Sequence, residues 1–339
     1  MHLQASLLAK LFGAIDAAVR SLELGCSQRA IEDEEVPFLL QALSLAAAAV
    51  GLPGGGGAAA PGGGAAAPPA MRRIDASSNY LSEVAVDHLA PLLRASAPAL
   101  QLLDLSNNRL GDEGAQRLAR VFCDAALPQL HALKLRWCQL SDPGVVALAQ
   151  ARRAEMRAHI DTRARRTSSP GRAFELARSP PISQAMSTGQ TPALAELELD
   201  ANRIGDQGLT GLAGALLVAA PGTMALTELG LGNGYGGNLI GDVGLLSLLQ
   251  AARAGRLARL RRLTLSNNEV SDEAAAQLTE IISEGAMPAL RLVALQSNFI
   301  ADYRLRPLSE ECKRRSVTLL SSAQLTRSAH LQASAWVAA

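Results

Sequence analysis

The chain has few aromatic residues, and this limits how its core can be built. Phe, Trp and Tyr make up 3% of its 339 residues, whereas 48% of the residues are hydrophobic. A chain of this length is long enough for two average domains or for one long repeat array. Its core must therefore be built from Leu, Ala, Val and Ile.

Cysteine is also scarce, and its spacing excludes two kinds of structure. Cys26, Cys123, Cys138 and Cys312 lie far apart and form no C-x-x-C pair. This spacing argues against a disulfide framework and against a zinc site, and it indicates a reducing compartment. The first residues show neither the basic region nor the small-residue cleavage site of a signal peptide,. We expect a cytoplasmic or nuclear protein.

Neither a strong net charge nor a long hydrophobic run is present. The net charge of +1 gives no overall attraction to nucleic acid or to anionic membranes,. The most apolar stretch, residues 36–52, is shorter than the ~20 residues that cross a bilayer. It also contains Gln41 and Ser44. We expect a buried helix there, and no nucleic-acid or membrane partner.

Catalytic motifs are missing as well. The five histidines, at positions 2, 88, 131, 159 and 330, form no H-E-x-x-H, and the chain has neither G-x-S-x-G nor a P-loop,. We therefore expect no enzyme, no metal and no cofactor.

One glycine pattern argues the other way, because Gly232, Gly234 and Gly237 satisfy G-x-G-x-x-G between an apolar run and a predicted helix,. The acidic residue that a dinucleotide site needs about 20 residues later is missing.

An internal repeat explains this glycine run better. The pattern L-x-x-L-x-L-x-x-N-x-[LIV]-[GS]-D-x-G, followed by a helical stretch, recurs with a period of 30 in LQLLDLSNNRLGDEG (100–114) and LHALKLRWCQLSDPG (130–144). Eight copies begin at positions 19, 71, 100, 130, 194, 226, 260 and 290. Deleting residues 234–237 brings the copy at 226–244 into register, so we interpret these glycines as an insertion in a repeat loop.

The pattern resembles the leucine-rich repeat family. A period near 30 with a full helix is similar to the ribonuclease-inhibitor-like class, which includes the repeat regions of NOD-like receptors and of Ran GTPase-activating proteins. The resemblance implies an α/β fold over residues 1–320. We expect a right-handed solenoid, or horseshoe, of about eight repeats, with parallel strands on the concave face and helices on the convex face.

Three segments fall outside the repeat. A Gly/Ala/Pro insertion at 51–70 and an Arg/Ser/Pro insertion at 151–190 are expected to be flexible, and the tail 321–339 is expected to be disordered,. The second insertion offers three candidate phosphorylation sites, with an inert solvated loop as the alternative. They are Ser168, Ser169 and Ser179,.

Two sets of recurring polar residues are interpreted as structural. The first is an Asn/Cys ladder that satisfies backbone groups where each strand ends. The second is an aspartate that recurs just before each helix, and we expect its carboxylate to cap the helix N–H groups. The ladder residues are Asn79, Asn108, Cys138, Asn202, Asn238, Asn268 and Asn298.

The strand residues that point away from the core define the candidate binding face. Acids gather on the copies at 194 and 226, next to a basic and aromatic group on the copy at 130, and Trp and Arg often anchor interfaces. The alternative is a solvated face on which unlike charges neutralise each other; in a third interpretation the insertion 151–190 folds over the acids. The candidate residues are Asp104, Lys134, Arg136, Trp137, Glu196, Glu198, Asp200, Glu228 and Arg262.

We therefore expect a non-enzymatic scaffold that binds a protein partner through its concave face. A GTPase activator similar to the Ran type, with a small GTPase as partner, is one alternative. Residues 321–339 contain no acid, unlike the acidic tail typical of that family. The sensor repeat region of a NOD-like receptor is the other alternative, although the chain contains no P-loop.

Overall fold

The computed structural model describes residues 15, 18, 21–49, 69–124, 127–149, 194–218 and 225–321. The insertions predicted at 51–70 and 151–190 and the tail 321–339 lie outside these residues, except for 69, 70 and 321. The three candidate phosphorylation sites also lie outside them.

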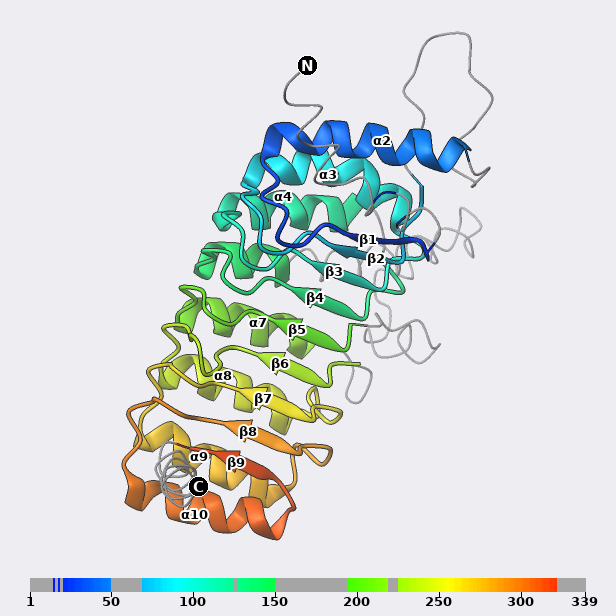
Figure 1. Ribbon diagram of the computed structural model, residues 1–339. Helices are drawn as coiled ribbons and strands as arrows, with labels where there is room; N and C mark the ends of the chain where they lie inside the picture. The colour runs from blue at the N-terminus through cyan, green and yellow to red at the C-terminus, as the bar shows by residue number, and fades with distance from the viewer. Residues whose placement is uncertain are drawn as a thin grey trace, which may run out of the picture.

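Within the described residues, nine short parallel strands form one sheet, and each strand pairs with the next in chain order (Figure 1). A one-by-one order of this kind is what a solenoid produces, because each repeat contacts only its neighbours. The strands are β1 (Glu23–Gly25), β2 (Arg73–Asp75), β3 (Leu102–Asp104), β4 (Ala132–Lys134), β5 (Glu196–Glu198), β6 (Glu228–Gly230), β7 (Arg262–Thr264), β8 (Leu292–Ala294) and β9 (Thr318–Leu320).

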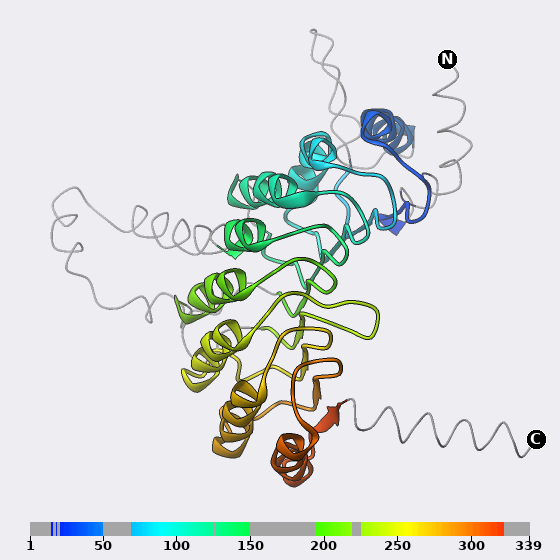
Figure 2. The same cartoon turned by 90° about the vertical axis from the view of Figure 1, so that its left-hand side faces the viewer.

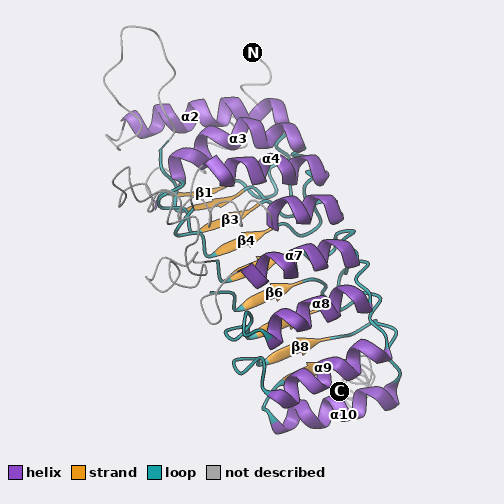
Figure 3. Ribbon diagram, turned by 180° about the vertical axis from the view of Figure 1, so that it is seen from behind, coloured by secondary structure: helices purple, strands orange, loops and turns teal. Residues whose placement is uncertain are grey.

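The helices form a second layer behind the sheet, as Figure 3 shows from that side. Residues 142–149 are also helical. The other elements are a short 3-10 helix, η1 (Asp33–Glu35), and the helices α2 (Val36–Ala49), α3 (Glu83–Ser96), α4 (Gly111–Asp124), α7 (Asp206–Val218), α8 (Asp242–Arg253), α9 (Asp272–Glu284) and α10 (Asp302–Arg314).

The central residue of each strand builds the core. In the register of the sheet, Ile74 lies beside Leu103, and Leu103 lies beside Leu133. These side chains are buried, whereas the first and third residues of most strands are half-buried or exposed on the opposite face. A repeat cannot bury such a leucine alone, so the stacking of neighbours stabilises the array.

The stack is curved, with the strands on the inner side and the helices on the outer side (Figure 2). Strands stack about 4.8 Å apart, whereas packed helices need 8–10 Å. The wider helical layer therefore lies on the outside. The outward strand residues accordingly lie on the concave side of the molecule, which we call the inner face.

Candidate functional site

Buried asparagine side chains connect neighbouring repeats where each strand ends. The Asn202 amide oxygen accepts the N–H groups of Cys138 and Leu140, each at 3.0 Å. Its Nδ2 donates to the carbonyls of Leu135 and Leu199, at 2.8 and 2.9 Å. Nδ2 also donates to the carbonyl of Asp200 at 3.3 Å. One amide thus contacts five backbone groups on two repeats, which is a structural role.

Cys138 occupies the ladder position in its own repeat, but it supplies fewer contacts. Its thiol donates to the carbonyl of Leu105 at 3.2 Å. Backbone N–H groups of Asn108 and Asn107 approach its sulfur, but sulfur is a weaker acceptor than an amide oxygen,. Burial raises the pKa of Cys138 to about 12, so the group is a neutral thiol at physiological pH,.

The recurring aspartates bind helix N-termini, but not those of their own helices. Asp206 is the first residue of α7, and its Oδ1 accepts the N–H groups of Gly241 and Gly244, both at 2.8 Å, at the start of α8. Asp112 makes the same contacts to Ser141 and Gly144. The expected capping of helix N–H groups is therefore confirmed, and the capped helix is that of the following repeat. The aspartate is itself a residue of the first helical turn, and its carboxylate extends sideways to the N–H groups at the start of the next helix.

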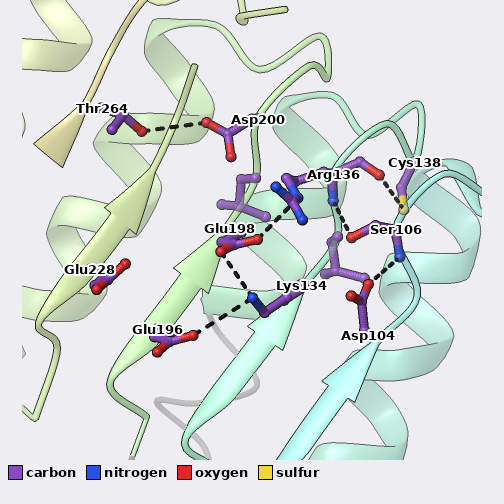
Figure 4. Close-up of polar contacts among 12 residues, drawn as sticks. Asp104, Ser106, Lys134, Arg136, Cys138, Glu196, Glu198, Asp200, Glu228 and Thr264 are labelled. Atoms are coloured by element: carbon purple, nitrogen blue, oxygen red, sulfur yellow. Dashed lines mark hydrogen bonds and ion pairs between the residues drawn. The ribbon is translucent and has the colours of Figure 1, made fainter. Parts of the chain in front are cut away.

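The charged residues predicted on the inner face form ion pairs with each other (Figure 4). Lys134 Nζ lies 3.1 Å from Glu198 Oε1 and 3.8 Å from Glu196 Oε2. Arg136 Nε lies 3.0 Å from Glu198 Oε2. The register causes this, because Lys134 on β4 lies directly beside Glu198 on β5. The basic and acidic groups therefore form one cluster, not two separate patches.

A second pair lies two strands along the inner face. Glu228 and Arg262 are opposite each other in β6 and β7, and their charged atoms are 3.5 Å apart. Asp104 lies on the same face at β3, where its carboxylate accepts the N–H of Ser106 at 2.9 Å.

Asp200 is not part of an exposed acidic patch, as the sequence interpretation assumed. Only 4% of its surface is exposed. Burial raises its pKa, and the neighbouring Glu198 raises it further, against the opposing effect of Arg136,. Its carboxylate accepts the N–H of Gly232. Asp200 is therefore a buried residue at the end of β5.

Trp137 follows β4 and lies at the strand-to-helix edge, not on the strand face. Its backbone has a φ of +54° and half of the residue is exposed. Positive φ is costly for a bulky residue. The corresponding residues in other repeats also have positive φ, and none of them is aromatic: Gln28, Ser78, Asn107, Ala201, Asn267 and Ser297.

The inserted glycines form a folded loop at this same edge. Asn233 N–H donates to the carbonyl of Gly236 at 2.9 Å, and Asn267 Nδ2 donates to the carbonyl of Asn233 at 2.6 Å. A Cβ on Gly237 would lie 1.5 Å from the Asn267 carbonyl oxygen, so only glycine fits there. Close packing between repeats thus explains this glycine, and Asn238 follows it in the ladder position.

Three further residues at this edge were missed by the sequence interpretation. Tyr80, Arg109 and Arg203 are exposed, and each follows a ladder asparagine directly. This position varies from repeat to repeat, as is typical of a turn residue. The signal that could have found them is the clustering of aromatic and basic residues in one column of the aligned repeats.

No group of three or more His, Cys, Asp or Glu residues in the described ranges could hold a metal ion. No helix in that part of the chain has the length and apolarity needed to cross a bilayer.

The stacked parallel strands, the outer helices and the buried Asn/Cys ladder together define an α/β leucine-rich repeat solenoid. Two stretches, residues 98–119 and 127–149, match the family model described as Leucine Rich repeat. They cover β3, the first part of α4, β4 and the helical residues after β4.

Solved structures with similarity to the chain include two repeat proteins. An internalin (inlF) from Listeria monocytogenes str. 4b F2365 is 15% identical; the match covers 74% of this chain and 67% of the internalin, with a TM-score of 0.29. The plant peptide hormone receptor RGFR1, solved in complex with RGF2, is 14% identical; the match covers 74% of this chain and 39% of the receptor, with a TM-score of 0.32. The matched region is thus less than half of the receptor's length. No curated protein sequence matches the chain.

Proposed function

We propose that this protein is a non-enzymatic scaffold that binds a partner protein through its inner face. Stacked repeats create extended concave surfaces of the kind that binding proteins use. The observation that carries the proposal is the cluster of Lys134, Arg136, Glu196 and Glu198, whose charged side chains hold one another in place on β4, on β5 and just after β4.

The ion pairs leave part of each charged group available to a partner. Glu196 Oε2 is 3.8 Å from Lys134, and its side chain is 40% exposed, compared with 19% for Glu198. Arg262 is also more than half exposed. Side chains that are already held in place lose little conformational freedom on binding, which favours recognition. Charges of both signs also select partners with the complementary pattern.

Three finer statements belong to this proposal. The period of 30 with a full helix in each repeat supports the ribonuclease-inhibitor-like class. Buried free thiols at Cys26, Cys138 and Cys312 support the reducing environment of the cytoplasm or nucleus,. The partner class is a folded protein, with a small GTPase as the first alternative to test.

The test is affinity capture from cell extract with the full chain and two charge-reversal variants. Glu196→Lys/Glu228→Lys changes the exposed acids of the inner face and leaves the buried Asp200 intact. Glu280→Lys/Glu310→Lys makes the same change on α9 and α10 and serves as the matched control. Both variants are first compared with wild type by circular dichroism and thermal melting.

We expect a partner that wild type and the control capture and the inner-face variant loses. Purified partner should then bind wild type at least about tenfold more tightly than the inner-face variant, because reversing an interface charge juxtaposes like charges. Equal capture by all three proteins would refute the inner-face proposal. A small GTPase that is captured, and whose hydrolysis is accelerated, would favour the GTPase-activator alternative.

A further inference from the structure

A groove runs along the strand-to-helix edge of the sheet, separate from the ion pairs of the inner face. It has a volume of about 740 Å³ and extends from the loop after β1 to the loop after β6. Figure 2 looks onto this edge, where the loop after β6 projects beyond its neighbours. Its lining includes Tyr80, Arg109, Trp137, Arg203 and Gly236.

The aromatic residues of the groove are exposed, although the chain has few of them. Tyr80 and Trp137 are each about half exposed, and Tyr235 at the tip of the loop after β6 is 90% exposed. Gly236 lies against the Trp137 ring, since a Cβ there would be 3.1 Å from the ring. The loop after β6 therefore reaches past the intervening repeat to Trp137 and closes one end of the groove.

The conformation of Trp137 supports a role in binding. Its left-handed backbone places a large indole side chain where other repeats carry Gln, Ser, Ala or Asn. Such a conformation costs roughly 1–2 kcal/mol, and strained residues cluster at functional sites. Packing does not account for Trp137, because half of its surface faces solvent.

The charges in the groove differ from those on the inner face. Arg109 stacks on Tyr80, with 5.7 Å between the guanidinium carbon and the ring centroid. Neither Arg109 nor Arg203 forms an ion pair with any carboxylate in the described ranges, and no residue lining the groove is acidic. The inner-face cations Lys134 and Arg136, in contrast, both have carboxylate partners. The groove thus presents two uncompensated positive charges beside exposed aromatic rings.

The length of the groove indicates the shape of its ligand. It crosses the loops of six successive strands, which at about 4.8 Å per step gives about 24 Å. An extended peptide advances about 3.3 Å per residue, so about seven or eight residues would fill it. Arg109 and Arg203 follow β3 and β5, about 10 Å apart. This spacing matches two acidic side chains three positions apart in a polyproline II segment, in which every third side chain lies on the same face about 9 Å further along.

We infer that this edge groove is a second binding site, which takes an extended acidic peptide segment of a partner protein. The arginines bind its carboxylates, and Trp137 and Tyr80 contact its apolar atoms. A single-stranded nucleic acid is also anionic and stacks on aromatic rings. It would need a longer row of cations to follow its phosphates, whereas the groove has two.

The probe is octaglutamate, acetylated and amidated at its ends and labelled with fluorescein, with octaglutamine as the neutral counterpart. Binding is measured by fluorescence anisotropy at low salt. Trp137 and Trp336 are the two tryptophans of the chain. In a Trp336→Phe background, a change in tryptophan emission therefore reports contact at Trp137.

Two variants locate the site. Arg109→Glu/Arg203→Glu reverses both groove cations, and Arg120→Glu/Arg306→Glu makes the same charge change on the exposed faces of α4 and α10. We expect octaglutamate to bind wild type and the control within about twofold of each other and the groove variant at least about tenfold more weakly. Added salt should weaken binding.

Four results would overturn the inference. They are no binding of octaglutamate, equal binding of octaglutamine, equal loss in the control variant, or tighter binding of oligothymidylate that depends on both groove arginines. The last result would reassign the groove to single-stranded nucleic acid. None of these results depends on the inner face, so this test and the capture experiment fail independently.

Discussion

The carboxylate of Asp200 lies in the space that Gly230 leaves free on the next strand. A Cβ built on Gly230 would be 2.7 Å from Asp200 Oδ2, closer than van der Waals contact allows. The Asp200 carboxylate also accepts the N–H of Gly232. Asp200 of one repeat therefore packs against Gly230 and Gly232 of the next. Glycine at the third position of β6 therefore leaves the room that the Asp200 side chain, just after β5, occupies.

Replacing Gly230 with alanine should destabilise the protein through this contact. Overpacking of a fitted site typically costs about 1–3 kcal/mol, and we expect a loss in that range from Gly230→Ala in urea unfolding. Asp200→Ala removes the atoms with which the new methyl group collides. In the Asp200→Ala background, Gly230→Ala should therefore cost much less, and additive losses would contradict the packing argument.

Asp200 should also make stability depend on pH. Its pKa in the folded protein is raised above the ordinary value of 3.8, mainly by burial. The folded state then holds this proton more tightly than the unfolded state does. The protonated Asp200 therefore adds to the free energy of unfolding. This contribution is fully present below the pKa of the unfolded state and is lost as the pH rises through the raised pKa of the folded state.

The measurement is urea unfolding of wild type and Asp200→Asn between pH of about 3.5 and 7, where each unit of pKa difference corresponds to about 1.4 kcal/mol. The stability of wild type relative to Asp200→Asn should decrease as pH rises. A constant difference across this range would show that Asp200 does not titrate as its burial requires.

The repeat made most of the fold predictable. Leucine spacing placed each strand and its buried central residue, and the recurring asparagine marked where each strand ends. The aligned repeats also place Lys134 beside Glu198, so neutralisation of unlike charges could be offered as an alternative. The choice between that alternative and separate charged patches was not predictable, because it depends on the distances between the charged atoms. The groove was missed for a related reason. Tyr80, Arg109 and Trp137 belong to three different repeats, and only stacking brings them to one edge.

The ladder should contribute to stability more at asparagine than at cysteine. Asn202→Ala removes five hydrogen bonds and leaves two N–H groups of the preceding repeat without their acceptor. Buried unsatisfied groups cost about 1–3 kcal/mol each, so we expect a loss of about 2–4 kcal/mol in urea unfolding. Cys138→Ala removes one weak thiol donor and should cost less. Gln250→Ala, on the exposed face of α8, is the control and should change little; equal losses at Asn202 and Cys138 would contradict the ladder argument.

The buried cysteines should resist thiol reagents as long as the protein is folded. Burial raises the pKa of Cys26 and Cys138 to about 12 and that of Cys312 to about 11. The reactive species is the thiolate. At a pH of about 8 each of the three cysteines is almost entirely in the unreactive thiol form, and each is also shielded from solvent,. In a Cys123→Ser variant, iodoacetamide should modify none of the three before unfolding and all three in denaturant, as measured by intact mass. Rapid modification of Cys138 in the native protein would mean that the ladder opens locally at this repeat, because access requires separating β4 and its loop from the neighbouring asparagines.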